Sequence, residues 1–310
     1  MRRVLVTGGA GFVGARVVQR LIEQDHDVAI VLRSTSDTRR LHGLLDHCTV
    51  LQGNLTNLEG LRTSIHAFAP QGVVHLAWEG VHGAERNNLI QMSNVSSSID
   101  LFQLTGEIGC SNFVGLGSQA EYGLLSGRVD ESAPTKPTTI YGAAKLATGC
   151  LLERAAVANN RPFAWLRLFS TYGPDDDPSW LIPYTIRKLL AGERPLLTKA
   201  EQTWDYIHVD DVADAIVSAL HTSAFGIFNL GSGQARPLRE IIEYLRDAID
   251  PDLLLGFGEV EYRPDQVMHL ESDIGALHTA TGWTPRVSLE QGLSSTIAWH
   301  RATLDKYPIH

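Results

Sequence analysis

The chain has 310 residues and a mass of 34.0 kDa, with 44% hydrophobic and 20% charged residues. A chain of this length buries roughly 75% of the surface that its unfolded form exposes, so it needs no disulfide or metal to fold. Its formal net charge of −9, without a basic stripe or tail, argues against a nucleic-acid-binding surface. The sequence has no run of about 18 apolar residues, so it predicts no membrane-spanning helix. The scattered Cys48, Cys110 and Cys150 indicate reduced thiols in a cytoplasmic protein and no metal site.

Short β-branched runs alternate with helical patterns over the first 170 residues. This alternation predicts parallel strands joined by right-handed crossovers, and strands this apolar fit a sheet covered on both faces. We therefore expect an α/β fold of the Rossmann type with a doubly wound parallel sheet. The predicted strands are 4–6, 28–32, 49–51, 72–76, 112–115 and 163–168, and the predicted helices are 13–24, 85–105 and 141–159.

The pattern changes after Pro174, where an acidic loop at 175–178 begins. We expect a dinucleotide-binding domain at 1–174 and a smaller substrate-binding lobe at 175–310 that closes over the ligand. The boundary stays open, because strands around 204–231 could rejoin the large sheet. In this half the sequence predicts helices at 181–190 and 238–247, a strand at 227–231 and otherwise irregular segments.

Glycines cluster at the first predicted strand-to-helix turn, where Gly8, Gly11 and Gly14 have the spacing G-x-x-G-x-x-G. Glycines at such a turn let the backbone approach a pyrophosphate and let the helix pack close to the sheet. The free N–H groups of the helix N-terminus, around Phe12 and Val13, then face the phosphates. The turn therefore predicts a bound dinucleotide.

The end of the second predicted strand indicates which dinucleotide is bound. NAD-binding proteins place a carboxylate there for the ribose, but this strand ends at Arg33, and Asp25 and Asp27 lie at its other end. The planar guanidinium of Arg33 can instead pair with a 2′-phosphate. We therefore favour NADP(H) over NAD(H), with Arg39 or Arg40 as alternative phosphate partners.

Tyr141 and Lys145 lie four residues apart on a predicted helix and so share a face. A free tyrosine has a pKa of about 10, and a nearby ammonium favours the phenolate. Lys145 is also placed to hold the nicotinamide ribose, and Ser118, just beyond the fifth strand, can hydrogen-bond the same substrate oxygen as Tyr141. With the glycine turn, these side chains predict oxidoreduction at a carbon that bears oxygen.

These motifs resemble the extended short-chain dehydrogenase/reductase family, specifically its nucleotide-sugar epimerases, dehydratases and reductases, over nearly the whole chain. The resemblance implies that Asn54 and Leu55 lie beside the adenine, that Leu76 and Ala77 line the cofactor, and that 167–174 completes the nicotinamide pocket. It also implies a homodimer paired through the helices at 85–105 and 141–158. Further similar motifs are 204–211, 263–264 and 282–285.

Two departures from the family pattern bear on the reaction. Dehydratases carry an acid and a base where this chain has Gln119 and Ala120 after Ser118, and Glu121 lies one position too late, so dehydration is disfavoured. Epimerases commonly have arginine where this chain has Trp204. At that point the sequence looks like the branch that reduces the C4 ketone of nucleotide-linked 4-keto-6-deoxyhexoses, such as CDP-abequose synthase.

The resemblance thus implies NADPH-dependent reduction of the C4 ketone of a nucleotide-diphospho-4-keto-6-deoxyhexose in deoxysugar biosynthesis. NAD-dependent C4 epimerisation of a nucleotide sugar is the alternative, and a non-catalytic dinucleotide sensor is a third hypothesis. We expect Arg263, or else Arg236, at the substrate diphosphate, and the segment 78–80 is a candidate for the sugar site. The other expected substrate contacts are Gln119, Thr171 and Trp204.

Overall fold

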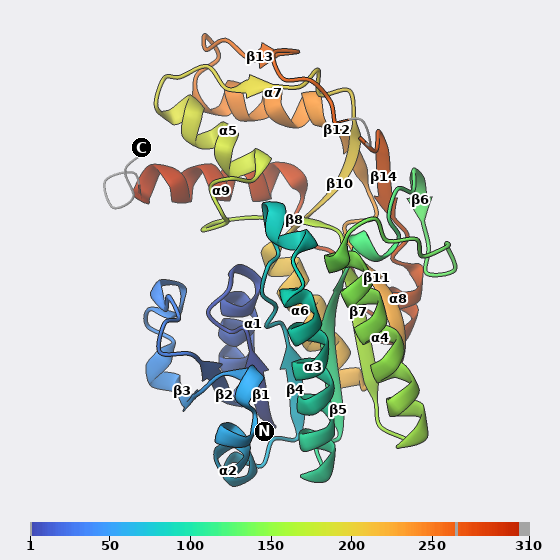
Figure 1. Ribbon diagram of the computed structural model, residues 1–310. Coiled ribbons are helices and arrows are strands. Elements are labelled where there is room, and N and C mark those ends of the chain that lie inside the picture. Colours follow the sequence, from blue (N-terminus) through green and yellow to red (C-terminus); the bar gives the residue numbers. More distant parts are fainter. Residues whose placement is uncertain (1, 264–265, 304–310) are drawn as a thin grey trace.

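The computed structural model describes residues 2–263 and 266–303. Within these ranges, seven parallel strands form a large sheet in the order β11-β7-β5-β4-β1-β2-β3, which confirms the predicted Rossmann-type α/β fold. Figure 1 shows helices on both faces of this sheet and a smaller lobe beyond the carboxyl ends of its strands. The strands are β1 (Arg3–Thr7), β2 (Asp27–Leu32), β3 (Cys48–Gln52), β4 (Gly72–His75), β5 (Asn112–Ser118), β7 (Phe163–Leu168) and β11 (Gly226–Leu230).

Two apolar layers bury the sheet, one on each face. In β1, Val4 and Val6 pack in the layer that α1 and α6 cover, whereas Leu5 packs in the opposite layer. Successive side chains of a strand point to opposite faces, so a strand covered on both sides is apolar at every position. The covering helices are α1 (Phe12–Glu23) and α6 (Val209–Thr222) on one face, and α2 (Glu59–Phe68), α3 (Ile90–Glu107) and α4 (Ile140–Ala158) on the other.

The smaller lobe has its own sheet and its own core. Its strands are β6 (Gly127–Val129), β8 (Ser170–Tyr172), β10 (Thr203–His208), β12 (Ala235–Pro237) and β14 (His269–Ser272), with a separate pair, β9 (Leu196–Leu197) and β13 (Gly256–Phe257). Its helices are α5 (Leu181–Leu190), α7 (Leu238–Ile249) and α9 (Leu289–Thr303), whereas α8 (Gly275–Thr281) packs against α6 and β11 of the large sheet. Ile186, Leu245 and Ile297 join α5, α7 and α9 in one apolar cluster.

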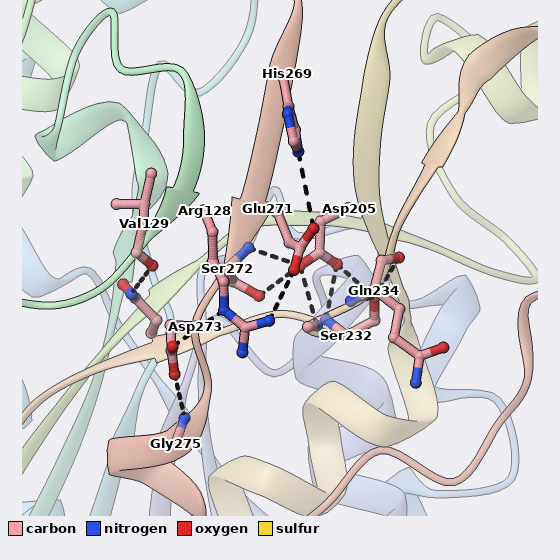
Figure 2. Close-up of polar contacts among 12 residues, drawn as sticks. Arg128, Val129, Asp205, Ser232, Gln234, His269, Glu271, Ser272, Asp273 and Gly275 are labelled. Atoms are coloured by element: carbon pink, nitrogen blue, oxygen red, sulfur yellow. Dashed lines mark hydrogen bonds and ion pairs between the residues drawn. The ribbon is translucent and has the colours of Figure 1, made fainter.

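Asp205 ties the lobe sheet to the turn that follows β11. Its buried carboxylate accepts hydrogen bonds from the backbone and hydroxyl groups of Ser232 and Ser272 and from the backbone N–H of Gly233, at 2.5–3.1 Å (Figure 2). A buried carboxylate is tolerated when such donors satisfy its oxygens. Arg128 lies beside this hub and pairs with Glu271 and Asp273 near the surface. The hub therefore fixes β10 and β14 at the carboxyl edge of the large sheet.

The helix predicted from residue 85 begins later, at Ile90. The side chain of Asn88 accepts a hydrogen bond from the Ile90 N–H, and Gly83–Asn87 forms a separate 3-10 turn (η4). The prediction of irregular structure at the end of the chain was wrong for α9. Its Ser, Thr and Gly residues are weak helix formers, so packing of Leu293 and Ile297 into the lobe core decides the conformation.

None of the helices in the described part of the chain is long and apolar enough to cross a bilayer. Between residues 2 and 303, apart from 264–265, no group of three or more His, Cys, Asp or Glu side chains is arranged to hold a metal ion.

Candidate active site

The glycine turn brings three pieces of backbone into contact. Gly8 has a φ of +73°, and a Cβ there would lie 2.6 Å from the nitrogen of Ala77, two residues beyond the end of β4. A Cβ on Gly14 would lie 2.0 Å from the Gly8 carbonyl oxygen, so α1 presses directly on the turn. Gly11 caps α1 without a side chain, which leaves the N–H groups around Phe12 and Val13 without a side-chain partner. This cradle fits the pyrophosphate of a nicotinamide dinucleotide.

A cavity of about 340 Å³ opens in front of this turn. Seven of the residues expected at the cofactor border it, and their elements are the carboxyl ends of β1, β2, β3 and β4 or the turns that follow them. Phe12, Val13, Gly14, Tyr141 and Lys145 are not among its lining residues. The seven that line it are Gly8, Gly11, Arg33, Asn54, Leu55, Leu76 and Ala77.

Charged side chains stand at the rim of this cavity. Arg33 forms an ion pair with Glu79, which comes from the segment after β4. Arg40 also borders the cavity, but its Nε and Nη2 donate to the Asp175 carbonyl oxygen at 3.1 and 2.8 Å. Asp37 adds a carboxylate to the same rim. The arginines that could bind a 2′-phosphate are thus already engaged by acidic residues.

Ser118, Tyr141 and Lys145 are brought together behind the cavity. Ser118 ends β5, and its hydroxyl lies close enough to the phenol of Tyr141, near the start of α4, to act on the pKa of that phenol. Lys145 lies one turn further along α4, and its Nζ donates to the Leu116 carbonyl oxygen at 2.6 Å. The same ammonium lies 3.7 Å from the centre of the Trp78 ring, which borders the cavity. The expected side chains are therefore neighbours in the fold.

The electrostatics of Tyr141 differ from the expectation. Burial raises the pKa of Tyr141, while its hydrogen bond with Ser118 and the Arg86 guanidinium act in the opposite direction. Arg86 lies 4.4 Å from the centre of the tyrosine ring, closer than the Lys145 ammonium at 5.9 Å. Burial also lowers the pKa of Lys145 to about 7. Lys145 therefore does not make this phenol acidic, contrary to the expectation from its spacing, and the facing cation is Arg86.

Glu121 is part of the structure beneath Ser118 and is not available for acid–base chemistry. It is fully buried, and its carboxylate accepts hydrogen bonds from Arg167 Nε at 2.8 Å, Trp165 Nε1 at 2.9 Å and the Ser118 N–H at 3.0 Å. The preceding Gln119 cannot donate a proton as an acid. Neither Gln119 nor Glu121 is therefore placed to act as the acid or the base that elimination of water requires.

The expected substrate-binding residues are scattered. The buried Oε1 of Gln119 and Oγ1 of Thr171 have no hydrogen-bond partner among the described residues, so each offers a polar atom to a ligand. Trp204 packs in the lobe cores and donates from Nε1 to Ser170 Oγ at 2.7 Å. Arg236 pairs with surface glutamates on α7 and α9, and Arg263 is exposed. Pro264, from the same motif as Arg263, lies outside the described residues.

Comparison with known proteins decides the family. Residues 4–231 match the model of the NAD dependent epimerase/dehydratase family. The chain belongs to this family. The match spans the glycine turn, the cavity and the Ser118, Tyr141 and Lys145 cluster, and it confirms the family resemblance inferred from the motifs.

Several known proteins resemble the chain over nearly its full length. It is 26% identical to dTDP-L-rhamnose 4-epimerase of Burkholderia thailandensis, over 98% of this chain and 96% of that protein. It is 29% identical to dTDP-glucose 4,6-dehydratase of Streptomyces griseus, over 96% and 93%. The structure of UDP-glucose 4-epimerase from Stenotrophomonas maltophila with bound NAD and formylated UDP-arabinopyranose has a TM-score of 0.86 at 26% identity, over 99% and 100%.

Sequence reasoning missed the residues of this family member that shape the segment 78–80. Gln91 is fully buried and donates from Nε2 to the carbonyl oxygens of Glu79 and Gly80, while its Oε1 accepts from Trp78 Nε1 at 2.7 Å. The amide of Asn94 bonds both the N–H and the carbonyl oxygen of Glu79. Two amides three residues apart on one helix face were the only signal in the sequence.

Proposed function

We propose that the chain uses NADPH to reduce the C4 ketone of a nucleotide-diphospho-4-keto-6-deoxyhexose. The observation that carries this proposal is the Ser118 hydroxyl, which acts on the phenol of Tyr141, beside buried Lys145, in a site where the neighbouring carboxylate, Glu121, is held by Arg167. Such a site can exchange a hydride and a proton at a carbonyl group. Glu121 is not free to remove a proton from a neighbouring carbon, as elimination of water requires.

NADPH supplies the hydride when it is bound at the glycine turn. The phenol of Tyr141 gives its proton to the oxygen at C4, and Ser118 donates a hydrogen bond to the same oxygen. Because burial raises the pKa of Tyr141, the phenol is protonated at neutral pH, which is the form that reduction needs. The buried setting strengthens these hydrogen bonds, since little water competes for the oxygen.

The charges at the cavity rim support NADPH as the cofactor. The strand β2 ends at Arg33 without the carboxylate that usually holds the adenosine ribose of NAD. Ser36 also borders the cavity and can donate to a 2′-phosphate. The names of the relatives support a nucleotide-diphosphate sugar as the substrate, and the free polar atoms of Gln119 and Thr171 suit sugar hydroxyl groups.

C4 epimerisation with NAD is a second candidate. Two of the relatives named above are 4-epimerases, and Asp37 places at the cavity rim the kind of group that accepts hydrogen bonds from a ribose diol. An epimerase must first oxidise a C4 hydroxyl, which requires Tyr141 to act as a base. The raised pKa of Tyr141 favours the opposite direction.

Incubation of the purified protein with NADPH and a panel of dTDP-, CDP- and UDP-4-keto-6-deoxyglucose tests this proposal. We expect loss of absorbance at 340 nm in proportion to the sugar consumed, and a Tyr141→Phe protein slower by about 10²- to 10⁴-fold. Conversion of UDP-glucose to UDP-galactose by protein that retains NAD, with no net NADPH consumption, would favour the second candidate instead.

A further inference from the structure

Arg33 and Glu79 face one another across the rim of the cofactor cavity. Arg33 follows β2, Glu79 follows β4, and the two side chains form an ion pair while remaining 49% and 42% exposed. Both residues line the cavity. We propose that Glu79 is a specificity-determining residue, which occupies Arg33 as an internal counter-ion and thereby reduces the preference for NADP(H) over NAD(H). This inference rests on the cofactor assignment in the proposed function.

Side chains of α3 hold the backbone of Glu79 and so limit where its carboxylate can lie. The side chain of Asn94 accepts from the Glu79 N–H at 3.0 Å and donates to its carbonyl oxygen at 2.9 Å, as a neighbouring strand would. Gln91 donates to the same carbonyl oxygen and to that of Gly80. Because α3 carries both amides, the segment cannot swing away from the cavity without breaking several partly buried hydrogen bonds.

Arg33 is fixed in a similar way on the opposite side. Its N–H donates to Ser36 Oγ at 3.0 Å, and its carbonyl oxygen accepts from the Ser36 N–H at 3.0 Å. Only the guanidinium end is therefore free to change partner. The ion pair between Arg33 and Glu79 therefore joins two held segments over the place where the adenosine ribose of a dinucleotide would lie.

A 2′-phosphate competes with Glu79 for this guanidinium. It carries more charge than a carboxylate and offers more acceptor oxygens, and the exposed ion pair that it must replace is weak. The phosphate therefore displaces Glu79 from Arg33, but the net gain in binding free energy is smaller than it would be with an unpaired Arg33. NAD has a hydroxyl at this position and does not have to displace Glu79, so its affinity does not depend on the ion pair. Glu79 should accordingly weaken the binding of NADP(H) alone, by a factor of about three to five.

Arg40 is the other rim arginine, but its geometry suits a structural contact. Two of its nitrogens bond the Asp175 carbonyl oxygen, and its Nε lies 3.4 Å from the Asp175 carboxylate. Its side chain is more deeply buried than that of Arg33. A phosphate that bound Arg40 would have to break these contacts with Asp175. Arg33 is therefore the arginine that exchanges partners.

Binding measurements without any sugar test the role of Glu79. Isothermal titration with 2′,5′-ADP and 5′-AMP separates the 2′-phosphate from the rest of the nucleotide. For Glu79→Gln we expect 2′,5′-ADP to bind about three- to fivefold more tightly, with 5′-AMP unchanged. For Arg33→Met we expect 2′,5′-ADP to bind at least about tenfold more weakly, and adding Glu79→Gln to this variant should have no further effect. Glu85→Gln, a nearby exposed carboxylate outside the cavity lining, is the matched control.

An equal change in the affinity of both nucleotides for Glu79→Gln would overturn the inference, as would unchanged binding of 2′,5′-ADP. A tightening that persists in the Arg33→Met background would show that Glu79 acts by direct repulsion and not by occupying Arg33, which also contradicts it. Glu79→Asp, which withdraws the carboxylate by one methylene, should bind 2′,5′-ADP with intermediate affinity. Because no sugar is present, failure of ketone reduction would leave these results standing.

Discussion

Arg167 and Glu121 form an ion pair from which water is excluded. Nε of Arg167 lies 2.8 Å from Oε2 of Glu121, and the two side chains are only 5% and 0% exposed. The pair joins β7 to the turn that follows β5, and Glu121 also accepts the N–H of Ser118. The position of the Ser118 hydroxyl, and hence its bond with Tyr141, depends on this pair.

Replacing Arg167 with methionine should destabilise the protein by about 3–5 kcal/mol, because it leaves the Glu121 carboxylate buried without its cation. Urea unfolding measures this loss. Adding Glu121→Leu to the same protein should recover part of it, since the unpaired charge is then gone. A single Arg167→Met protein within about 1 kcal/mol of the parent would contradict the assignment of a buried, charged pair.

Replacing Arg86 with methionine should change the pH dependence of catalysis. The substitution removes the cation over the Tyr141 ring, so the pKa of the phenol rises further. The alkaline limb of reduction should therefore move to higher pH. The reverse oxidation, which needs the phenolate, should slow at pH 8 by about tenfold if the pKa of the phenol rises by about one.

Arg154 is a suitable control for this experiment. It lies on the same helix as Tyr141 but is exposed and pairs with Glu153. Arg154→Met should leave both pH limbs in place. If Arg86→Met changed only the KM for the sugar, with both limbs unmoved, Arg86 would bind substrate and would not act on the phenol.

His75 should make the stability of the protein depend on pH. Ser98 Oγ donates to the Asn94 carbonyl oxygen, so it accepts from Nε2 of His75, and Nδ1 must accept from Thr7 Oγ1. Burial, aided by the Lys145 charge, lowers the pKa of His75 to about 3. The unfolded chain protonates this histidine below its ordinary pKa of about 6.5, and the folded chain does not. Each pH unit below 6.5 therefore removes about 1.4 kcal/mol of stability.

Urea unfolding of His75→Asn against the parent isolates this contribution. At pH 7 the variant should be less stable by about 2 kcal/mol, because the hydroxyls of Thr7 and Ser98 lose their partner. The gap should narrow by about 1.4 kcal/mol per pH unit below 6.5 and close near pH 5. A gap that stays constant between pH 7 and pH 5 would show that folded His75 takes up its proton as the unfolded chain does.

The homodimer remains a proposal, and the exposed faces of α3 and α4 indicate where it would form. The two helices pack side by side. Met92 on α3 and Leu151 on α4 are 62% and 51% exposed. Cys150 and Val157 extend the exposed stripe along α4. Exposed apolar side chains in one row suit a helical interface with a second copy.

Sedimentation velocity of a Leu151→Asp protein tests this interface. A charge at its centre should convert a dimer to monomers, whereas Leu124→Asp, an equally exposed leucine outside α3 and α4, should leave the dimer intact. A monomeric parent protein, or a Leu151→Asp dimer, would exclude this face.

Features that depend on local geometry could be predicted from the sequence. The glycine spacing predicted the cradle because each glycine is needed by contacts within a few residues or with the adjoining strand. The strands of the large sheet were predicted because most of their positions are apolar, as a sheet covered on both faces requires. Tyr141 and Lys145 share a helix face by the periodicity of the helix alone.

Features that depend on tertiary packing could not be predicted from the sequence. The pKa of Tyr141 depends on burial and on Arg86, which lies in the 3-10 turn η4 and not in the long helix that the sequence predicted from residue 85. Helix α9 forms from weak helix formers because the lobe core accepts its apolar face, and Gly292 lets it approach the Tyr172 hydroxyl. Trp204 was expected at the substrate, yet its indole is bonded to Ser170 within the lobe.

Reduction with NADPH that carries deuterium as the transferable hydrogen on C4 of its nicotinamide ring tests the central claim most directly. With a nucleotide-linked 4-keto-6-deoxyhexose, we expect one deuterium at C4 of the sugar for each NADP formed, and almost none with Tyr141→Phe. Unchanged NADPH and no deuterium in that sugar, together with inversion at C4 of a nucleotide-linked hexose that carries a C4 hydroxyl, would contradict ketone reduction and identify the enzyme as an epimerase.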